Sequence, residues 1–299
     1  MNKKQRRSVD GILLLNKPQQ VSSNQILQRV RWVYKAQKAG HAGTLDPFAD
    51  GLLPILFGDA TKFGQYLLGA DKRYQVSIRF GFETDTDDCE GTPTLNKGIP
   101  NLKEIDWEKV FESFLGAQQQ IPPIYSALKI NGRRAYDLAR AGEQPKLASR
   151  KIHIYELKLV DIEIDSIILE VHCSKGTYIR SLARDIGRYI GSAAHAKSLT
   201  RLAVGNFSQE QGYDLETLLA ISANIGIDGL DSYLLPLEKC VAKLSKFPVS
   251  EEKFRFIRNG NDISVNLNNG EYALFFNQQF FGVGEVIDKR LYPKRLCRI

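Results

Sequence analysis

Cysteine and histidine are scarce in this chain, with four of each among 299 residues. The cysteines, Cys89, Cys173, Cys240 and Cys297, lie far apart, and no two of them have the spacing of a metal or redox pair. His172 precedes Cys173 directly, but adjacent side chains on a strand point to opposite faces. We therefore expect no metal site and four free thiols in a reducing compartment.

Long hydrophobic runs and phosphate-binding glycine loops are also missing. No segment approaches the ~18 apolar residues of a membrane span, and the N-terminal apolar run ends at Asn16. The segment GVGEV (282–286) lacks the third glycine of a dinucleotide fingerprint. In TDTDDCEG (84–91) a cysteine occupies a ligand position of a calcium loop and the glycine comes too late. These absences predict a cytoplasmic protein without a membrane anchor, nucleotide cofactor or calcium site.

The composition that remains is that of a soluble folded protein with excess positive charge. Hydrophobic residues make up 43% of the chain and charged residues 25%, which provides for a sizeable core. Lys and Arg number 41 against 34 Asp and Glu, a net charge of +7. Many soluble proteins are basic, but the excess favours a polyanionic partner, nucleic acid before membrane.

Hydrophobic periodicity predicts a mixed α and β fold without internal repeats. One expected helix carries Arg29, Arg31 and Lys35 on a face that is either solvated or turned toward RNA. A later one repeats arginine at helical spacing, at positions 180, 184 and 188. Strands are expected at 11–15, at 72–80 and as a pair within 151–174, and helices at 22–37, 102–116 and 176–191.

The segment 118–146 is predicted to be a basic excursion from the main fold. Two prolines stiffen its beginning and Asn131-Gly132 forms a turn before a short basic helix. Because it can bury little apolar area alone, we expect it to be mobile without a ligand. Its cations are Lys129, Arg133, Arg134 and Arg140.

The sequence changes character near residue 245. A short helical pattern is followed by short apolar runs that Asn, Gly and Gln interrupt. We therefore divide the chain into a main domain, 1–244, and a β module, 245–299. A module of this size is too small to fold comfortably alone, so it is expected to dock on the main domain.

Asp46 is the most informative acid. It lies in GHAGTLDPFADGLLPI (40–55), among glycines and apolar residues. Asp before Pro commonly caps a helix that begins at the proline, so Asp46 could be a structural cap. However, burying a carboxylate in an apolar segment is unfavourable unless it is paired or has a task. In a basic protein, this loop is also a candidate for presenting a carboxylate to a polyanion.

Five segments in order strengthen the second interpretation, and together they resemble the motifs of the TruB family of tRNA pseudouridine synthases. The resemblance covers residues 11 to about 208, and the tail resembles a PUA-like RNA-binding module more loosely. The segments are GHAGTLDPFADGLLP (40–54), KRYQVSIRFGFETDTDDCEG (72–91), PPIYSALKINGRRAYDLARAG (122–142), CSKGTYIRSLARDIG (173–187) and AHAKSLTRLAVGNF (194–207).

This resemblance implies a fold and a reaction. The fold is α+β, with a central mixed and largely antiparallel sheet flanked by helices, a thumb insertion over about 118–146 and a C-terminal PUA-like module. The enzyme isomerises the uridine at position 55, in the T-loop of tRNA, to pseudouridine on a flipped-out base. No cofactor or metal is implied, and the expected partner is the T-arm of tRNA.

The resemblance also assigns roles to individual residues. Asp46 matches the nucleophile, Arg180 the arginine that pairs with it, and Tyr74 the tyrosine that stacks on the base. The same pocket is implied to contain Tyr178 and the backbone near Leu199. His41 matches a residue that contacts the substrate where the base leaves the loop, and Lys129 lies in the RNA-gripping thumb. Taken alone, Tyr74 would more often be a core tyrosine and Arg180 a solvated helix arginine, and it is the ordered motifs that reverse this preference.

Several alternatives remain open at this stage. Asp50, where the family pattern has a small or hydroxyl residue, would raise the pKa of Asp46 if the two faced each other, although we expect it to point into solvent. A glycoside hydrolase would use Asp46 and Asp50 as its carboxylate pair. A noncatalytic tRNA chaperone would use the same basic surface. The path at Asp46 is also open between attack on the ribose, attack on the ring and formation of a glycal. We expect a monomer.

Overall fold

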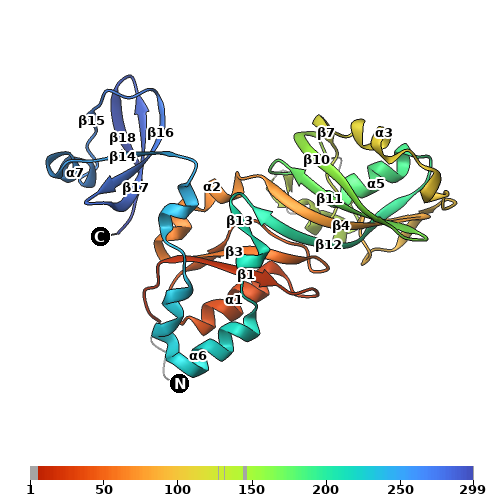
Figure 1. Cartoon of the computed structure of the whole chain (residues 1–299), viewed down its shortest axis with the longest axis horizontal. Coiled ribbons are helices and arrows are strands. Elements are labelled where there is room, and N and C mark those ends of the chain that lie inside the picture. Colours follow the sequence, from red (N-terminus) through yellow and green to blue (C-terminus); the bar gives the residue numbers. More distant parts are fainter. Residues whose placement is uncertain (1–5, 127, 131, 144–146, 299) are drawn as a thin grey trace.

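The computed structural model describes residues 6–126, 128–130, 132–143 and 147–298 (Figure 1). A nine-stranded sheet crosses the main body, with the order β1-β3-β12-β4-β11-β10-β7; β2 pairs with β3, and β13 with β12. Every pairing in it is antiparallel except that of β12 with β3. The predicted mixed, largely antiparallel sheet is therefore confirmed. Its strands are β1 Gly11–Lys17, β2 Ala39–His41, β3 Asp50–Phe57, β4 Lys72–Phe80, β7 Gly116–Gln120, β10 Arg150–Ile162, β11 Ser166–Cys173, β12 Ala194–Val204 and β13 Phe207–Ser208.

Strand β4 has the side-chain alternation that its sequence predicts. Val76, Ile78 and Phe80 are buried, whereas Arg73 and Arg79 are exposed; Ser77, between them on the polar face, is buried as well. Strands β1 and β3 differ, because both are buried along nearly their whole length. The uninterrupted apolar runs of these two strands therefore mark a part of the sheet that is covered on both faces.

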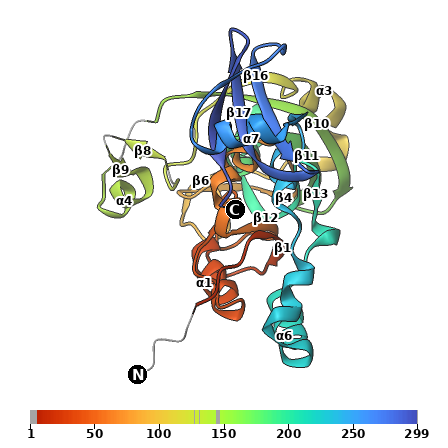
Figure 2. The same ribbon diagram turned by 90° about the vertical axis from the view of Figure 1, so that its left-hand side faces the viewer.

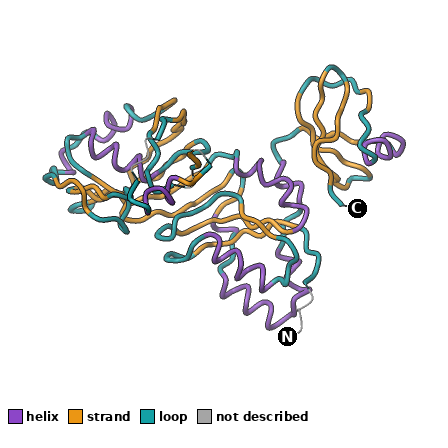
Figure 3. Tube along the Cα trace, turned by 180° about the vertical axis from the view of Figure 1, so that it is seen from behind, coloured by secondary structure: helices purple, strands orange, loops and turns teal. Residues whose placement is uncertain are grey.

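Helices cover the two halves of the sheet separately (Figure 3). Helix α1 (Ser23–Val33), capped by Ser22, and helix α6 (Leu215–Gly229) pack near β1 and β3. Helices α5 (Ile179–Tyr189) and α3 (Trp107–Glu112) pack on β4, β10 and β11. The prediction of one helix over 102–116 was wrong: Asp106 caps α3, and β7 begins at Gly116, where the backbone has φ +80°. None of the helices in the described ranges is long and apolar enough to cross a membrane.

The basic excursion stands away from the sheet (Figure 2). Its first predicted residues belong instead to β7, the edge strand of the main sheet. The remainder contains the short hairpin β8 (Lys129–Ile130) and β9 (Arg133–Arg134), followed by α4 (Ala135–Arg140). The side chains of Lys129, Arg134 and Arg140 lie outside the described residues.

The C-terminal part forms a five-stranded sheet, β14-β16-β17-β18-β15, with helix α7 (Glu251–Arg258) beside it. Phe280 meets Phe63 edge-on, with ring centroids 5.2 Å apart, and Lys62 Nζ donates to the Leu296 carbonyl at 2.9 Å. These contacts confirm that the β module docks on the body, at the 3-10 helix η1 (Gly58–Phe63), which helix α2 (Gly64–Leu68) follows directly. Its strands are β14 Ser245–Pro248, β15 Ile263–Ser264, β16 Gly270–Phe276, β17 Gln279–Ile287 and β18 Arg290–Leu296; the small hairpin β5 (Phe82–Thr84) and β6 (Pro93–Asn96) lies in the body.

Candidate active site

Asp46 lies on the loop between β2 and β3, and no helix begins at Pro47. The Ala49 N–H donates to the Asp46 carbonyl at 3.2 Å, which closes a turn, and strand β3 starts at Asp50. The Asp46 side chain is 37% exposed. The carboxylate therefore lies on a loop and is only partly exposed, and the helix-cap interpretation of Asp46 was wrong.

A buried arginine on β12 holds this loop on both sides of Asp46. Arg201 is 1% exposed; its Nε donates to the Leu52 carbonyl at 2.7 Å and its Nη2 to the Gly43 carbonyl at 3.0 Å. The parallel pairing of β12 with β3 places Arg201 opposite Gly51. Gly51 has φ +96°, and a Cβ added there would lie 2.4 Å from the Arg201 carbonyl oxygen. Both features fix the path of the loop that carries Asp46.

Arg180, at the start of α5, is the partner of Asp46. Its side chain is 5% exposed, and its Nε lies 2.9 Å from Asp46 Oδ2. Its Nη1 contacts Asp88 Oδ2 at 3.1 Å and donates to the Thr86 carbonyl at 2.8 Å, while its Nη2 donates to the Tyr125 carbonyl at 2.9 Å. One guanidinium thus joins the Asp46 loop, the Asp-rich segment and the beginning of the basic excursion, which excludes a solvated role for Arg180.

The arginines that follow on α5 also pair with the Asp-rich segment and its preceding strand. Arg184 Nη1 lies 2.7 Å from Asp87 Oδ2, and Arg188 contacts both carboxylate oxygens of Glu83 at 2.7 Å. The arginine spacing on the helix therefore matches a row of carboxylates. These carboxylates serve as ion-pair partners that fix α5 and Arg180 against the body.

Two opposing effects act on the Asp46 carboxyl. Burial raises its pKa above the ordinary value, the guanidinium of Arg180 lowers it, and the charge of Asp88 raises it. Asp88 is therefore the acid with the largest effect on the pKa of Asp46. Asp50 Oδ2 accepts from Gln19 Nε2 at 3.0 Å in an exposed hydrogen bond, whereas its Oδ1 is buried, so the expectation that Asp50 points into solvent holds for only one of its two oxygens.

Asp46 and Arg180 line a pocket with a volume of about 340 Å³. Tyr74, Tyr178 and Leu199 line the same pocket, which brings together five of the seven predicted site residues. Gln120 positions Tyr178 by accepting from its N–H at 2.8 Å and donating to its carbonyl at 3.0 Å. The other lining residues are Gly43, Thr44, Leu45, Leu68, Lys72, Ser126, Ser174, Gly176, Thr177, Ile179 and Arg201.

The remaining two predicted residues are not part of that pocket lining. His41 lies on β2, opposite Ile55, and its Nδ1 is buried without a hydrogen-bond partner among the described residues. Burial and the nearby Arg201 charge lower its pKa, which favours the neutral imidazole. The Lys129 side chain is outside the described residues.

Comparisons with known proteins decide which enzymes this site resembles. Residues 31–179 match the TruB family pseudouridylate synthase N-terminal domain, and residues 180–242 match the tRNA pseudouridylate synthase B C-terminal domain. Residues 246–297 match the C-terminal domain of pseudouridine synthase II TruB. The chain belongs to the TruB family of pseudouridine synthases. It is an enzyme of the isomerase class.

Curated TruB relatives match over almost their entire length. The tRNA pseudouridine synthase B of Actinobacillus pleuropneumoniae is 42% identical, with 99% of each chain covered. That of Coxiella burnetii (strain Dugway 5J108-111) is 43% identical, covering 98% of this chain and 96% of the relative. That of Pseudomonas aeruginosa is 41% identical, covering 99% and 98%.

Solved structures have the same fold. A Cbf5-Nop10-Gar1 complex contains a chain that aligns with a TM-score of 0.72 at 25% identity, covering 93% of this chain and 78% of that one. A chain of an H/ACA RNP bound to a substrate RNA aligns with a TM-score of 0.73 at 22% identity, covering 96% of this chain and 84% of that one. These alignments agree with the sheet and the C-terminal module described above.

Three residues of this TruB-family site were not predicted individually from the sequence. Arg201 was recognised only as part of a motif, Asp88 only as part of an acidic run, and Gln120 was not singled out. A signal for Arg201 is present, because an arginine between Leu199 and Leu202 interrupts an apolar strand pattern. No local pattern reveals the contacts of Gln120, because they join residues 58 positions apart in the sequence.

Proposed function

We propose that this enzyme converts the uridine at position 55, in the T-loop of tRNA, to pseudouridine, with Asp46 as the nucleophile and without a cofactor. The observation that carries the proposal is the 2.9 Å ion pair between Asp46 and buried Arg180 in a pocket that Tyr74 also lines. The curated relatives named tRNA pseudouridine synthase B support the choice of tRNA as the substrate.

The reaction rearranges bonds within one nucleotide. The bond from ribose C1′ to N1 of uracil breaks, the ring turns, and C1′ bonds to C5. The proton on C5 leaves, and N1 gains a proton, so nothing is oxidised or reduced. Each path considered for Asp46 requires an electron pair from its ionised carboxylate, which the Arg180 guanidinium stabilises.

The base must leave the T-loop to reach Asp46. Flipping a nucleotide costs a few kcal/mol, and stacking on an aromatic ring returns ~1–3 kcal/mol. Tyr74 is suited to this role because it lines the pocket from β4 and is packed on one side against the hydrophobic core. Tyr178 and Leu199 complete the walls, so the pocket can shield the separated base from water.

Further parts of the chain would bind the remainder of the tRNA. In this proposal residues 1–244 form the catalytic domain, Lys129 and its thumb hold the T-arm, and His41 contacts the RNA where the base leaves the loop. Residues 245–299 form a PUA-like RNA-binding module. The enzyme acts as a monomer in the cytoplasm.

The test is a cofactor-free reaction with an unmodified tRNA transcript, with mapping of pseudouridine along the RNA. We expect one pseudouridine, at position 55, and none in a transcript with cytidine at that position. A glycoside hydrolase would release free uracil, and a noncatalytic chaperone would bind the tRNA without changing it. Either result, or modification outside the T-loop, would contradict the proposal.

A further inference from the structure

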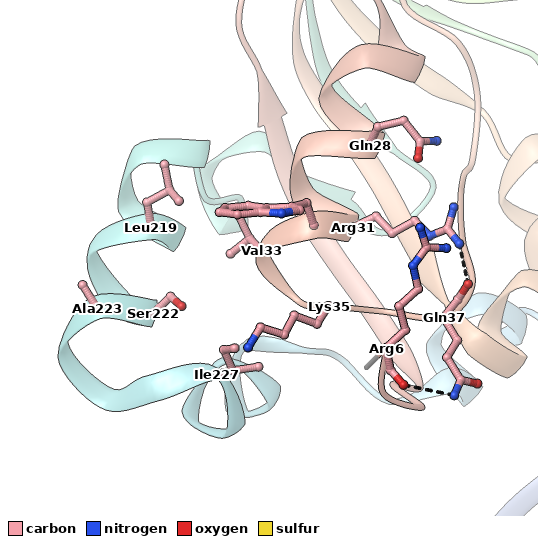
Figure 4. A pocket seen from close by; sticks show the side chains of 11 residues that line it. Arg6, Gln28, Arg31, Val33, Lys35, Gln37, Leu219, Ser222, Ala223 and Ile227 are labelled. Atoms are coloured by element: carbon pink, nitrogen blue, oxygen red, sulfur yellow. Dashed lines mark hydrogen bonds between the residues drawn. The ribbon is translucent and has the colours of Figure 1, made fainter. Parts of the chain in front are cut away.

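A second and larger groove lies between α1 and α6, on the part of the body formed by β1 and β3 (Figure 4). Arg31, Trp32 and Lys35 reach it from α1 and the turn that follows. Leu219 and Ile227 reach it from α6, and Arg6 from the N-terminal segment. The groove includes two of the three cations on the helix face that the sequence marked as solvated or RNA-facing.

The groove is strongly cationic. Its lining has two arginines and one lysine, and no aspartate or glutamate among the residues that the structure describes. The neighbouring acids are engaged elsewhere: Arg7 contacts Asp231 at 2.6 Å and Asp228 at 3.7 Å. Arg31 is held in place, because its Nε and Nη2 donate to the carbonyls of the turn after α1, at 3.2 and 2.6 Å. A lining of this charge favours an anionic ligand.

The groove also offers flat and apolar surface. The Trp32 side chain is 64% exposed, and Leu219 is 43% exposed. Leu219 and Ala223, four residues apart, form one apolar stripe along α6, and Ile227 lines the groove beyond a kink at Gly226. Cations that converge beside an aromatic ring and an apolar wall are the features with which proteins bind unpaired nucleotides.

The dimensions favour more than one nucleotide. The groove has a volume of about 1160 Å³, roughly three times the 340 Å³ of the Asp46 pocket that would hold a single flipped nucleotide. Asp46 lies nine positions after Gln37, which lines the groove. A chain of that length spans at most ~30 Å, so both sites lie within reach of one tRNA.

We propose that the α1–α6 groove binds an unpaired segment of the substrate tRNA outside the T-arm. Its phosphates contact Arg6, Arg31 and Lys35, and its bases pack on Trp32 and the apolar stripe of α6. This inference rests on the proposed function, because it adds a second contact for the same tRNA. The groove then increases the affinity for full-length tRNA and takes no part in the chemistry at Asp46.

The test compares two ligands, full-length tRNA and an isolated T-arm stem-loop, in binding assays at several salt concentrations. The first variant combines Arg6→Gln with Lys35→Gln, and the second is Trp32→Ala. Arg31 is left intact because it also holds the turn after α1. The matched control combines Lys103→Gln with Lys158→Gln, two exposed lysines that line neither pocket.

We expect the Arg6/Lys35 variant to bind full-length tRNA more weakly, with the salt slope of log affinity reduced by about 1.4–1.8, since each lost phosphate contact removes ~0.7–0.9. Trp32→Ala should weaken full-length tRNA roughly fivefold or more, because stacking on an aromatic ring contributes at least ~1 kcal/mol per base. Both variants should bind and modify the isolated T-arm like the wild type, and the control should match the wild type on both RNAs.

Equal affinity of variants and wild type for full-length tRNA would overturn the groove assignment. An equal loss on both RNAs would overturn it as well, because the groove would then belong to the T-arm site. If the variants bound tRNA like the wild type but bound a synthetic acidic amphipathic helix more weakly, the groove would be a protein-docking site instead. Absence of pseudouridine from wild-type reactions on the T-arm would count against the proposed function, whatever the groove binds.

Discussion

Replacing Arg201 tests how the fold fixes the position of Asp46. In Arg201→Met the chain loses the donors to the Leu52 and Gly43 carbonyls, at 2.7 and 3.0 Å. A buried carbonyl left without a donor costs about 1–3 kcal/mol. The bond to Leu52 is buried and that to Gly43 is partly buried, so the free energy of unfolding should fall by at least about 1–3 kcal/mol. That is a large part of the ~5–15 kcal/mol that stabilises a typical domain.

Turnover should fall for a separate reason. The two carbonyls flank Asp46, so their release allows the loop to shift, and misplacement of a reacting group by about 1 Å reduces turnover about 100-fold. Arg201→Lys keeps the charge but loses the forked donor geometry. We therefore expect the lysine variant to retain most of the defect in kcat, with a smaller change in KM.

Urea unfolding and single-turnover pseudouridine formation measure the two effects. Arg73→Met is the matched control, because Arg73 lies on the adjacent strand and its ion pair with Glu156 is about half exposed on both sides. Such a surface pair contributes only ~0–1 kcal/mol. If Arg201→Met resembled Arg73→Met in both stability and turnover, Arg201 would not position the loop.

Three further predictions concern the loop, its charge and the thumb. Gly51→Ala should destabilise the protein and reduce kcat, because the new Cβ would lie 2.4 Å from the Arg201 carbonyl oxygen and residue 51 has φ +96°. Unfolding and turnover assays check this. Asp88→Asn removes a negative charge that raises the pKa of Asp46, so it should lower that pKa. The fall of kcat/KM at acidic pH, where Asp46 is protonated and inactive, should therefore move to lower pH. A fall at the same or a higher pH would contradict the assignment. Arg133→Ala should reduce the salt slope of tRNA affinity by ~0.7–0.9 with little change in stability, since its ion pair with Glu143 is exposed; an unchanged slope would exclude a phosphate contact.

Local patterns predicted the elements that carry strong periodicity. Strand β4 and helix α5 were found because alternation and helical spacing are both read within a few residues. The expected helix over 102–116 failed for a local reason as well, since Asp106 starts a new helix and Gly116 admits a positive φ. These breaks outweighed an amphipathic pattern that looked continuous.

The site was predictable only in part. The ordered motifs identified Asp46, Arg180 and Tyr74, and the structure brings them into one pocket. The interactions that hold them were not predictable, because the contacts of Arg201 to Leu52 and Gly43 span about 150 residues of sequence. Such contacts depend on the parallel pairing of β12 with β3, and neither strand had been assigned from the sequence.

The central claim is that the ionised carboxylate of Asp46 carries out the reaction, and Asp46→Asn tests it most directly. The amide is nearly isosteric, and Arg180 keeps its contacts with Asp88, Thr86 and Tyr125, so the fold should persist. Burial raises the pKa of Asp46 in the folded state, so its charged form opposes folding above the unfolded pKa, and Asn should not reduce stability at neutral pH. In a single-turnover assay at saturating tRNA, we expect no pseudouridine at position 55 from a variant that unfolds and binds tRNA like the wild type. Substantial turnover by that folded, tRNA-binding variant would contradict the mechanism.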